Sequence, residues 1–157
     1  MIKVLFVCLG NICRSPTAHA VFEKKVANLN LADTVTVDSC GTGDWHIGQA
    51  PDQRSQDAAQ QRGYDLSVLS ARQLCPQDFE SFDYILAMDA RNMADILKCM
   101  PSSYAGQVQL FLDYATDNAL TEVPDPYFGD EDGFERVLNL VESASDGLLA
   151  HIQQRLA

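Results

Sequence analysis

The sequence has 157 residues, the length of one compact domain, and 46% of them are hydrophobic, as is usual for a globular protein. Its 11 basic and 22 acidic residues give a net charge of −11, which makes nucleic acid and anionic membranes poor partners. No run approaches the roughly 18 apolar residues of a membrane-spanning helix, and no charged leader opens the chain. We therefore expect a single domain over residues 1–157 and a cytoplasmic location.

Apolar runs alternate with helical patterns along the chain. In chain order we expect a strand at residues 2–7, a helix at about 15–28, a strand at 35–38, a helix at 52–62, a strand at 82–88, a helix at 90–98 and a strand at 108–112. Gly63 is placed to end the second helix, and Asp89 is placed to cap the third. In the last helix, apolar residues from Phe134 to Ile152 recur at intervals of three and four.

This alternation predicts an α/β fold, a three-layer sandwich in which a four-stranded parallel sheet carries helices on both faces. In such folds, ligands bind at the carboxyl ends of the strands, where the chain turns into a helix. The first turn of this kind begins at Cys8.

The five cysteines are scattered along the chain: Cys8, Cys13, Cys40, Cys75 and Cys99. Their odd number, without a signal peptide, indicates reduced thiols, not a disulfide framework. No pair has the Cys-x-x-Cys spacing and the three histidines lie far apart, so spacing argues against a zinc site. We expect neither a metal nor a cofactor.

The segment from Cys8 to Pro16 is the most informative part of the sequence. Five residues separate Cys8 from Arg14, and Pro16 stands where a helix would begin. Such a turn brings backbone amides and a positive helix end to one point, which favours binding of a tetrahedral anion. Gly10 and Asn11 are the residues best able to take a positive φ. The predicted phosphate-binding residues are Leu9, Gly10, Asn11, Ile12, Cys13 and Ser15.

The same segment supplies a nucleophile. A cysteine beside an arginine and a helix N-terminus tends to be ionised, so we expect Cys8 to attack phosphorus. Arg14 offers a planar fork of donors for two phosphate oxygens, and Ser15 can donate its hydroxyl to the departing thiolate. A buried cysteine with an unrelated arginine nearby is the simpler alternative, but it leaves the rest of the constellation unexplained. The Gly-Lys-Ser/Thr ending of a nucleotide-binding loop is absent.

The segment Cys-Leu-Gly-Asn-Ile-Cys-Arg-Ser-Pro at residues 8–16 resembles the signature of the low-molecular-weight protein-tyrosine phosphatases. The similarity extends to residues 37–39, 82–86 and 125–127. It implies a flavodoxin-like fold and hydrolysis of phosphotyrosine in proteins, and of small aryl phosphates, through a cysteinyl-phosphate intermediate. Cys8 would be the nucleophile and Arg14 a phosphate ligand.

The resemblance also assigns a proton donor. Asp125 lies between two prolines that stiffen its loop, and the family uses an aspartate at this place first as general acid and then as base. The nearby acidic residues 130–132 suggest the start of the last helix, with Asp130 as a candidate cap.

The family's pocket walls correspond to three aromatic residues: Trp45, Tyr127 and Phe128. Many relatives carry a tyrosine in place of Phe128, so Tyr127 is the one candidate for phosphorylation in its loop. A related branch that acts on phosphoarginine tends to have threonine in place of Ile12, so isoleucine favours phosphotyrosine. Ser39 is expected to hydrogen-bond Asn11 and hold the loop.

Two other functions remain open. Arsenate reduction on the same scaffold needs a relay of closely spaced cysteines, which Cys75 and Cys99 do not provide. A non-catalytic phosphoprotein-binding module is the second alternative. Expected partners are phosphotyrosine proteins, with a tyrosine kinase of the same cell as one candidate, and the chain is expected to be a monomer or a weak homodimer. The family further suggests a reversible Cys8–Cys13 disulfide that makes the enzyme redox-sensitive.

Overall fold

The computed structural model describes residues 1–116, 120–129 and 132–157. Its strands are β1 (Ile2–Cys8), β2 (Val35–Gly41), β3 (Tyr84–Ala87) and β4 (Gln107–Leu110). Its helices are α1 (Arg14–Asn28), α2 (Gln53–Gln60), α3 (Asp78–Ser81), α4 (Ala90–Cys99), the 3₁₀ turn η1 (Phe111–Tyr114) and α5 (Asp132–Leu156). Among the described residues, no helix combines the length and the apolar character needed to cross a membrane.

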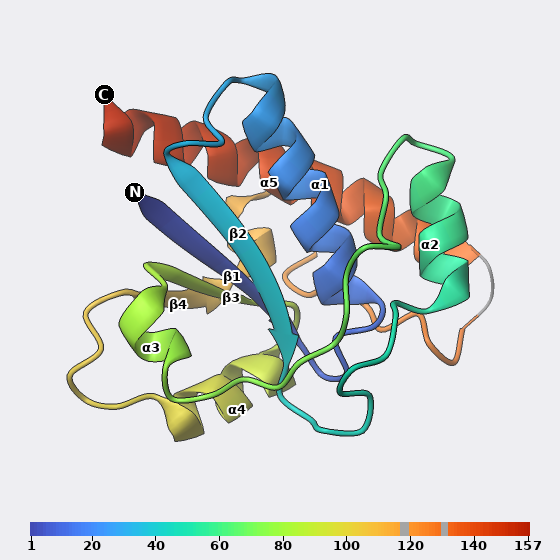
Figure 1. The fold of residues 1–157 in the computed structure, drawn as a ribbon, viewed down its shortest axis with the longest axis horizontal. Helices are drawn as coiled ribbons and strands as arrows, with labels where there is room; N and C mark the ends of the chain where they lie inside the picture. The colour runs from blue at the N-terminus through green and yellow to red at the C-terminus, as the bar shows by residue number, and fades with distance from the viewer. Residues whose placement is uncertain (117–119, 130–131) are drawn as a thin grey trace.

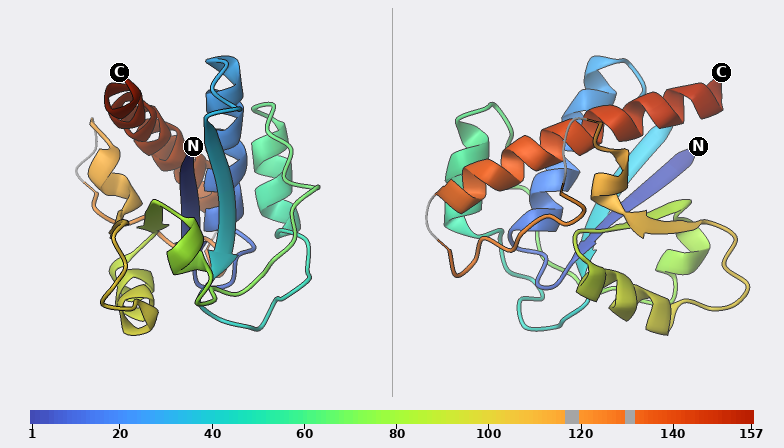
Figure 2. Two further views of the ribbon diagram at one scale, coloured as in Figure 1. Left: turned by 60° about the vertical axis from the view of Figure 1, so that its left-hand side comes forward. Right: turned by 180° about the vertical axis from the view of Figure 1, so that it is seen from behind.

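The strands form one parallel sheet in the order β2-β1-β3-β4. Helices α1 and α5 pack against one face, while α3 and α4 lie against the other (Figure 1). Seen from behind, the long α5 crosses the molecule on its own side of the sheet (Figure 2). The predicted α/β three-layer sandwich is therefore confirmed, and the neighbours of β1 on both sides place its carboxyl end in the interior.

The strand β1 belongs to two hydrophobic cores because alternate side chains of a strand point to opposite faces. Val4 and Phe6 pack in the core beneath α1 and α5. Leu5 and Val7 pack in the smaller core beneath α3 and α4. Burial on both faces explains the unbroken apolar run in this part of the sequence, and it fixes the position at which Cys8 leaves the sheet.

The predicted boundaries differ mainly at three strands: β2 extends three residues beyond the predicted end at residue 38, and β3 and β4 are shorter than predicted. Both β3 and β4 have only four residues, and β4 ends because the chain turns into η1 after Leu110 and buries Phe111 and Leu112 against α5. The short α3 was not predicted. Gly63 has a φ of 85° after α2, and Asp89 accepts a hydrogen bond from the amide of Asn92, as expected for a helix stop and a helix cap. The predicted cap Asp130 lies outside the described residues.

Candidate active site

The loop from Cys8 to Cys13 leaves the centre of the sheet and enters α1. The carbonyl oxygens of Cys8, Leu9 and Ile12 accept hydrogen bonds of 2.8–2.9 Å from amides of the segment 42–52. The loop amides that donate to no described residue are those of Leu9, Gly10, Ile12 and Cys13. Neighbouring backbone thus occupies the carbonyls and leaves the amides available, an arrangement that suits an anion.

Asn11 fixes the shape of this loop. Its φ is 58°, a left-handed conformation that costs little for asparagine when its side chain bonds locally. The side-chain Nδ2 donates to Ser15 Oγ at 2.7 Å, and Oδ1 accepts from the amide of Arg72 at 3.1 Å. The positive φ predicted for Asn11 is confirmed. The one predicted for Gly10 is wrong: this glycine lacks a positive φ, and a Cβ there would lie 2.9 Å from Cδ2 of His46.

The Cys8 sulfur lies in a ring of hydrogen bonds. It is 3.0 Å from Ser15 Oγ and accepts from the amide of Asn11 at 3.3 Å. Because Ser15 Oγ accepts a hydrogen bond from Asn11 Nδ2, its own hydroxyl hydrogen is free to point at the sulfur or at the Cys40 carbonyl, 3.3 Å away. The Asn11 amide, and the Ser15 hydroxyl in one of its two orientations, therefore donate to the same sulfur atom.

Arg14, the first residue of α1, is only 2% exposed. Its Nη1 donates to Asp89 Oδ2 at 2.7 Å and to the Val123 carbonyl at 3.0 Å. Burial opposes the charge, but Cys8 and Asp89 outweigh that effect and raise the pKa of Arg14 above its ordinary value. The guanidinium therefore stays charged and fixed along one edge. Asp89 was predicted only as a helix cap, and it also holds the arginine.

Asp125 stands at the mouth of the site. One carboxylate oxygen accepts from the amide of Tyr127 at 3.1 Å, and the other lies 3.7 Å from Arg14 Nη2. The side chain of Asp125 is partly exposed at the edge of the cleft. The structure thus brings the predicted proton donor to the predicted phosphate ligand.

A cleft of about 230 Å³ opens above the loop. It is lined by Cys8, Leu9, Gly10, Ile12, Cys13, Arg14, Trp45, His46, Asp125, Tyr127 and Phe128. The three predicted aromatic walls are present, with Trp45 66% and Phe128 94% exposed. The rings of Tyr127 and Phe128 pack edge to face, with their centroids 4.8 Å apart. His46 was not predicted, because a lone histidine in a loop carries no signal of its own.

Known proteins similar in sequence to this chain belong to one enzyme family. The sequence model described as "Low molecular weight phosphotyrosine protein phosphatase" matches residues 3–157. A curated relative, low molecular weight protein-tyrosine-phosphatase YfkJ of Bacillus subtilis, is 42% identical over 154 residues, covering 98% of this chain and 97% of the relative. The chain belongs to the low-molecular-weight phosphotyrosine protein phosphatases.

Solved structures of the phosphatase family have the same fold. A protein tyrosine phosphatase of Entamoeba histolytica, crystallised with Hepes in its active site, superposes with a TM-score of 0.95 at 40% identity, and all of both chains is covered. The Drosophila arginine phosphatase DARP superposes with a TM-score of 0.90 at 33% identity over 96% of this chain and 98% of that one. The scaffold alone therefore does not decide between a tyrosine and an arginine substrate.

Ser39 was expected to hydrogen-bond Asn11, but its side chain bonds another residue. Ser39 Oγ lies 3.0 Å from His19 Nδ1, and no hydrogen bond joins Ser39 to Asn11. The prediction of that bond is wrong, because Ser15 and Arg72 already occupy the amide group of Asn11. His19 lies one helical turn after Ser15 and is 7% exposed, and this burial lowers its pKa. Ser39 therefore contacts α1, not the loop.

Arg72 provides support that the sequence did not reveal. Its guanidinium pairs with Asp78 at 3.0–3.1 Å and with Asp38 at 3.0–3.1 Å. Burial disfavours the charge, but these two carboxylates and Cys40 outweigh it and raise the pKa of Arg72. With the side chain anchored, its backbone amide is held against Asn11.

Gly41, the last residue of β2, packs directly under the loop from Cys8 to Cys13, called the phosphate loop below after its expected ligand. A Cβ at this position would lie 2.6 Å from the Leu9 carbonyl oxygen and 3.2 Å from the Asn11 nitrogen. Its amide donates to the Arg72 carbonyl at 2.9 Å. Only glycine allows this close approach of the two backbones.

All five cysteines are free, so no disulfide joins Cys8 to Cys13. Burial raises the pKa of Cys13 to about 12, so this thiol is neutral at physiological pH. The predicted Cys8–Cys13 disulfide stays a prediction. Among the described residues, no group of three or more histidine, cysteine, aspartate or glutamate side chains is arranged to hold a metal ion.

Proposed function

We propose that this protein hydrolyses phosphotyrosine in proteins, and small aryl phosphates, through a cysteinyl-phosphate intermediate. The observation that carries the proposal is the Cys8 sulfur, held by Ser15 and Asn11 at 3.0 and 3.3 Å in a cleft that Arg14 and Asp125 share. A nucleophile, an anion-binding loop and a proton donor thus converge on one point, which is what transfer of a phosphoryl group to an enzyme requires.

In the first step, the loop amides and Arg14 bind the non-bridging phosphate oxygens and neutralise their charge. The Cys8 thiolate attacks phosphorus in line with the phenolic oxygen, so a sulfur–phosphorus bond forms as the phosphorus–oxygen bond breaks. Tyrosine has a pKa near 10, so its oxygen leaves more readily when Asp125 supplies a proton. A general acid of this kind contributes roughly 10²–10⁴-fold to the rate.

In the second step, Asp125, now a carboxylate, removes a proton from water as that water attacks phosphorus. The sulfur–phosphorus bond breaks, inorganic phosphate forms, and Cys8 leaves as a thiolate that accepts the Ser15 hydroxyl hydrogen bond. Proton and bond counts balance over the cycle without any further reactant.

The cleft walls support tyrosine as the substrate. Trp45, Tyr127 and Phe128 offer flat apolar faces to a phenyl ring, and Ile12 adds an apolar side chain below them. Because a family neighbour is named an arginine phosphatase, phosphoarginine is the comparison substrate. We expect phosphotyrosine peptides to be hydrolysed with the higher kcat/KM. The natural substrates would then be proteins modified by a tyrosine kinase.

The test is hydrolysis of p-nitrophenyl phosphate in the presence of EDTA, with wild type beside Cys8→Ser and Asp125→Asn. Cys75→Ser is the matched control, because this cysteine lies outside the cleft. We expect no turnover from Cys8→Ser, a loss of roughly 10²–10⁴-fold from Asp125→Asn, and unchanged activity in the control. Mass spectrometry of a quenched reaction should locate phosphate on Cys8.

A folded and reduced wild type without activity would contradict the proposal, and arsenate with a thiol reductant would then be the next substrate to assay. Full activity of Asp125→Asn would remove this residue from its proposed role while leaving the nucleophile in place.

A further inference from the structure

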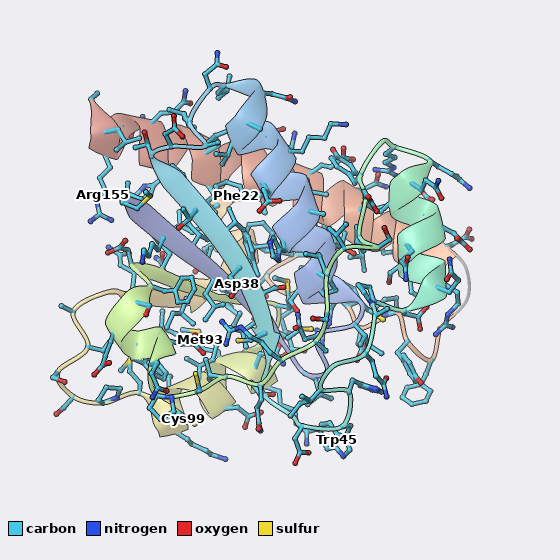
Figure 3. All side chains as sticks on the ribbon, viewed as in Figure 1. Phe22, Asp38, Trp45, Met93, Cys99 and Arg155 are labelled. Atoms are coloured by element: carbon cyan, nitrogen blue, oxygen red, sulfur yellow. The ribbon has the colours of Figure 1, made fainter. Side chains whose placement is uncertain are left out.

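A second groove, of about 320 Å³, adjoins the active-site cleft on the far side of Trp45. It is lined by Leu9, Thr42, Gly43, Trp45, Gln73, Leu74, Arg91, Asp95, Lys98 and Cys99. Leu9 and Trp45 line both hollows, so the groove is continuous with the wall of the cleft. Figure 3 shows Trp45 and Cys99, at the end of α4, along the same edge of the molecule beyond the tip of β2.

The α4 wall of this groove is charged. Arg91, Asp95 and Lys98 follow one another at spacings of four and three residues, so they lie on one face of the helix. Neither Arg91 nor Lys98 forms an ion pair with any residue that the structure describes, whereas Arg14 and Arg54 beside the cleft are both paired. Two cations and one carboxylate leave one net positive charge here, in a chain whose net charge is −11.

The shared wall places this charge within reach of a bound substrate. An extended peptide advances about 3.3–3.6 Å per residue, so residues within three positions of a phosphotyrosine in the cleft extend past Trp45. Unpaired cations on an exposed helix face attract a carboxylate in such a segment. Thr42 and Gly43 add a backbone floor along which a peptide can lie.

We propose that this groove binds an aspartate or glutamate side chain flanking the phosphotyrosine, and that Arg91 and Lys98 make the enzyme prefer acidic phosphopeptides. The inference rests on the proposed function, because it concerns the substrate of the same cleft. An exposed ion pair is weak, so one well-placed carboxylate raises kcat/KM by about 1.5- to 5-fold. Salt screens the preference, because both partners are exposed.

The experiment compares phosphotyrosine peptides that carry a single glutamate or glutamine at each position from three residues before to three residues after the phosphotyrosine. Wild type is measured beside the double variant Arg91→Gln/Lys98→Gln and beside Asp95→Asn. Lys3→Gln is the control, because it removes a positive charge at the opposite end of β1. Hydrolysis of p-nitrophenyl phosphate, which is too small to reach the groove, reports on the catalytic site in each variant.

We expect wild type to prefer glutamate at one or more positions by about 1.5- to 5-fold at low salt. The double variant should lose the preference while its activity on p-nitrophenyl phosphate is unchanged. Asp95→Asn should increase the preference, because it removes the one negative charge of the groove, and Lys3→Gln should retain the wild-type value.

Absence of any glutamate preference in the wild type would overturn the inference, and so would a preference that survives in the double variant. Either result with normal hydrolysis of p-nitrophenyl phosphate would leave the proposed function intact. A folded wild type inactive on both kinds of substrate would instead overturn the proposed function, and the inference with it.

Discussion

The floor and the rim of the cleft are built in opposite ways. On the floor, Cys8 and Arg14 are each 2% exposed, and their reactive atoms are held by hydrogen bonds to fixed partners. On the rim, Trp45 is 66% and Phe128 94% exposed. In the proposed mechanism, the groups that would meet the transition state are thus buried and held in a fixed network, whereas the groups that would contact the substrate are exposed.

The strongest challenge to the floor is Arg14→Lys. Lysine keeps the charge but loses the planar fork, which bonds Asp89 and Val123 through Nη1 and would bind phosphate through Nη2 in the proposed mechanism. We expect kcat/KM on p-nitrophenyl phosphate to fall roughly 10²–10³-fold, with weaker inhibition by vanadate. Near wild-type turnover would mean that charge alone, without fixed geometry, suffices on the floor.

Gly41→Ala should damage the floor from beneath. The added methyl group meets the Leu9 carbonyl oxygen, which can move only with the phosphate loop. We expect the free energy of unfolding in urea to fall by about 1–3 kcal/mol, together with kcat.

Gly129→Ala in the rim loop is the matched control for this change. The nearest atom to a Cβ at Gly129 is the Pro126 carbonyl oxygen at 3.6 Å, an ordinary contact. We expect stability and kcat close to wild type. Equal damage from the two alanines would abolish the distinction between floor and rim.

Trp45→Ala tests the rim with a smaller expected effect. Because the indole is mostly exposed, its loss should change the free energy of unfolding by less than about 0.5 kcal/mol. KM for a phosphotyrosine peptide should rise about 3- to 10-fold, since a wall for the phenyl ring is lost, while kcat changes little. A large fall in kcat would place the tryptophan among the groups that meet the transition state.

The smallest effect is a pH dependence of stability from His19. Burial lowers its pKa in the folded protein, whereas an unfolded histidine has a pKa near 6.5. The unfolded chain therefore binds a proton first as pH falls, and the stabilisation present above pH ~6.5 is lost below it. Urea unfolding at pH 7.5 and 5.5 should show a larger loss for wild type than for His19→Gln. Equal losses would contradict a buried neutral histidine beneath Ser39.

The sequence predicts the floor well because its essential parts are contiguous. Cys8, Asn11, Arg14 and Ser15 lie within eight residues between a buried strand and a helix, so local geometry and chemistry together indicate their arrangement. Strands β1 and β3 were predicted for a similar reason, since each is a largely apolar run between helical patterns. The shortened β4 could not be predicted, because its end depends on how η1 packs against α5.

The residues that hold Asn11 and Arg14 in place could not be predicted from the sequence. Arg72 acts on Asn11 from 61 positions along the chain, and the Val123 carbonyl bonds Arg14 across 109 positions. No residue type or spacing distinguishes these partners from other residues in the sequence. The error at Ser39 has the same origin, because which polar group it faces depends on where α1 places His19.

The hydrogen bonds that fasten the segment 42–52 to the phosphate loop are made by backbone amides, not by side chains. Every residue except proline supplies such an amide, so these anchors do not depend on particular side chains, although Gly48, with a φ of 83°, is a position that favours glycine. Mutation can therefore alter the residues around Trp45 while the chemistry below stays unchanged. The segment around Trp45 can thus take new side chains at the rim of the cleft while the backbone bonds that hold the loop of Cys8 stay in place.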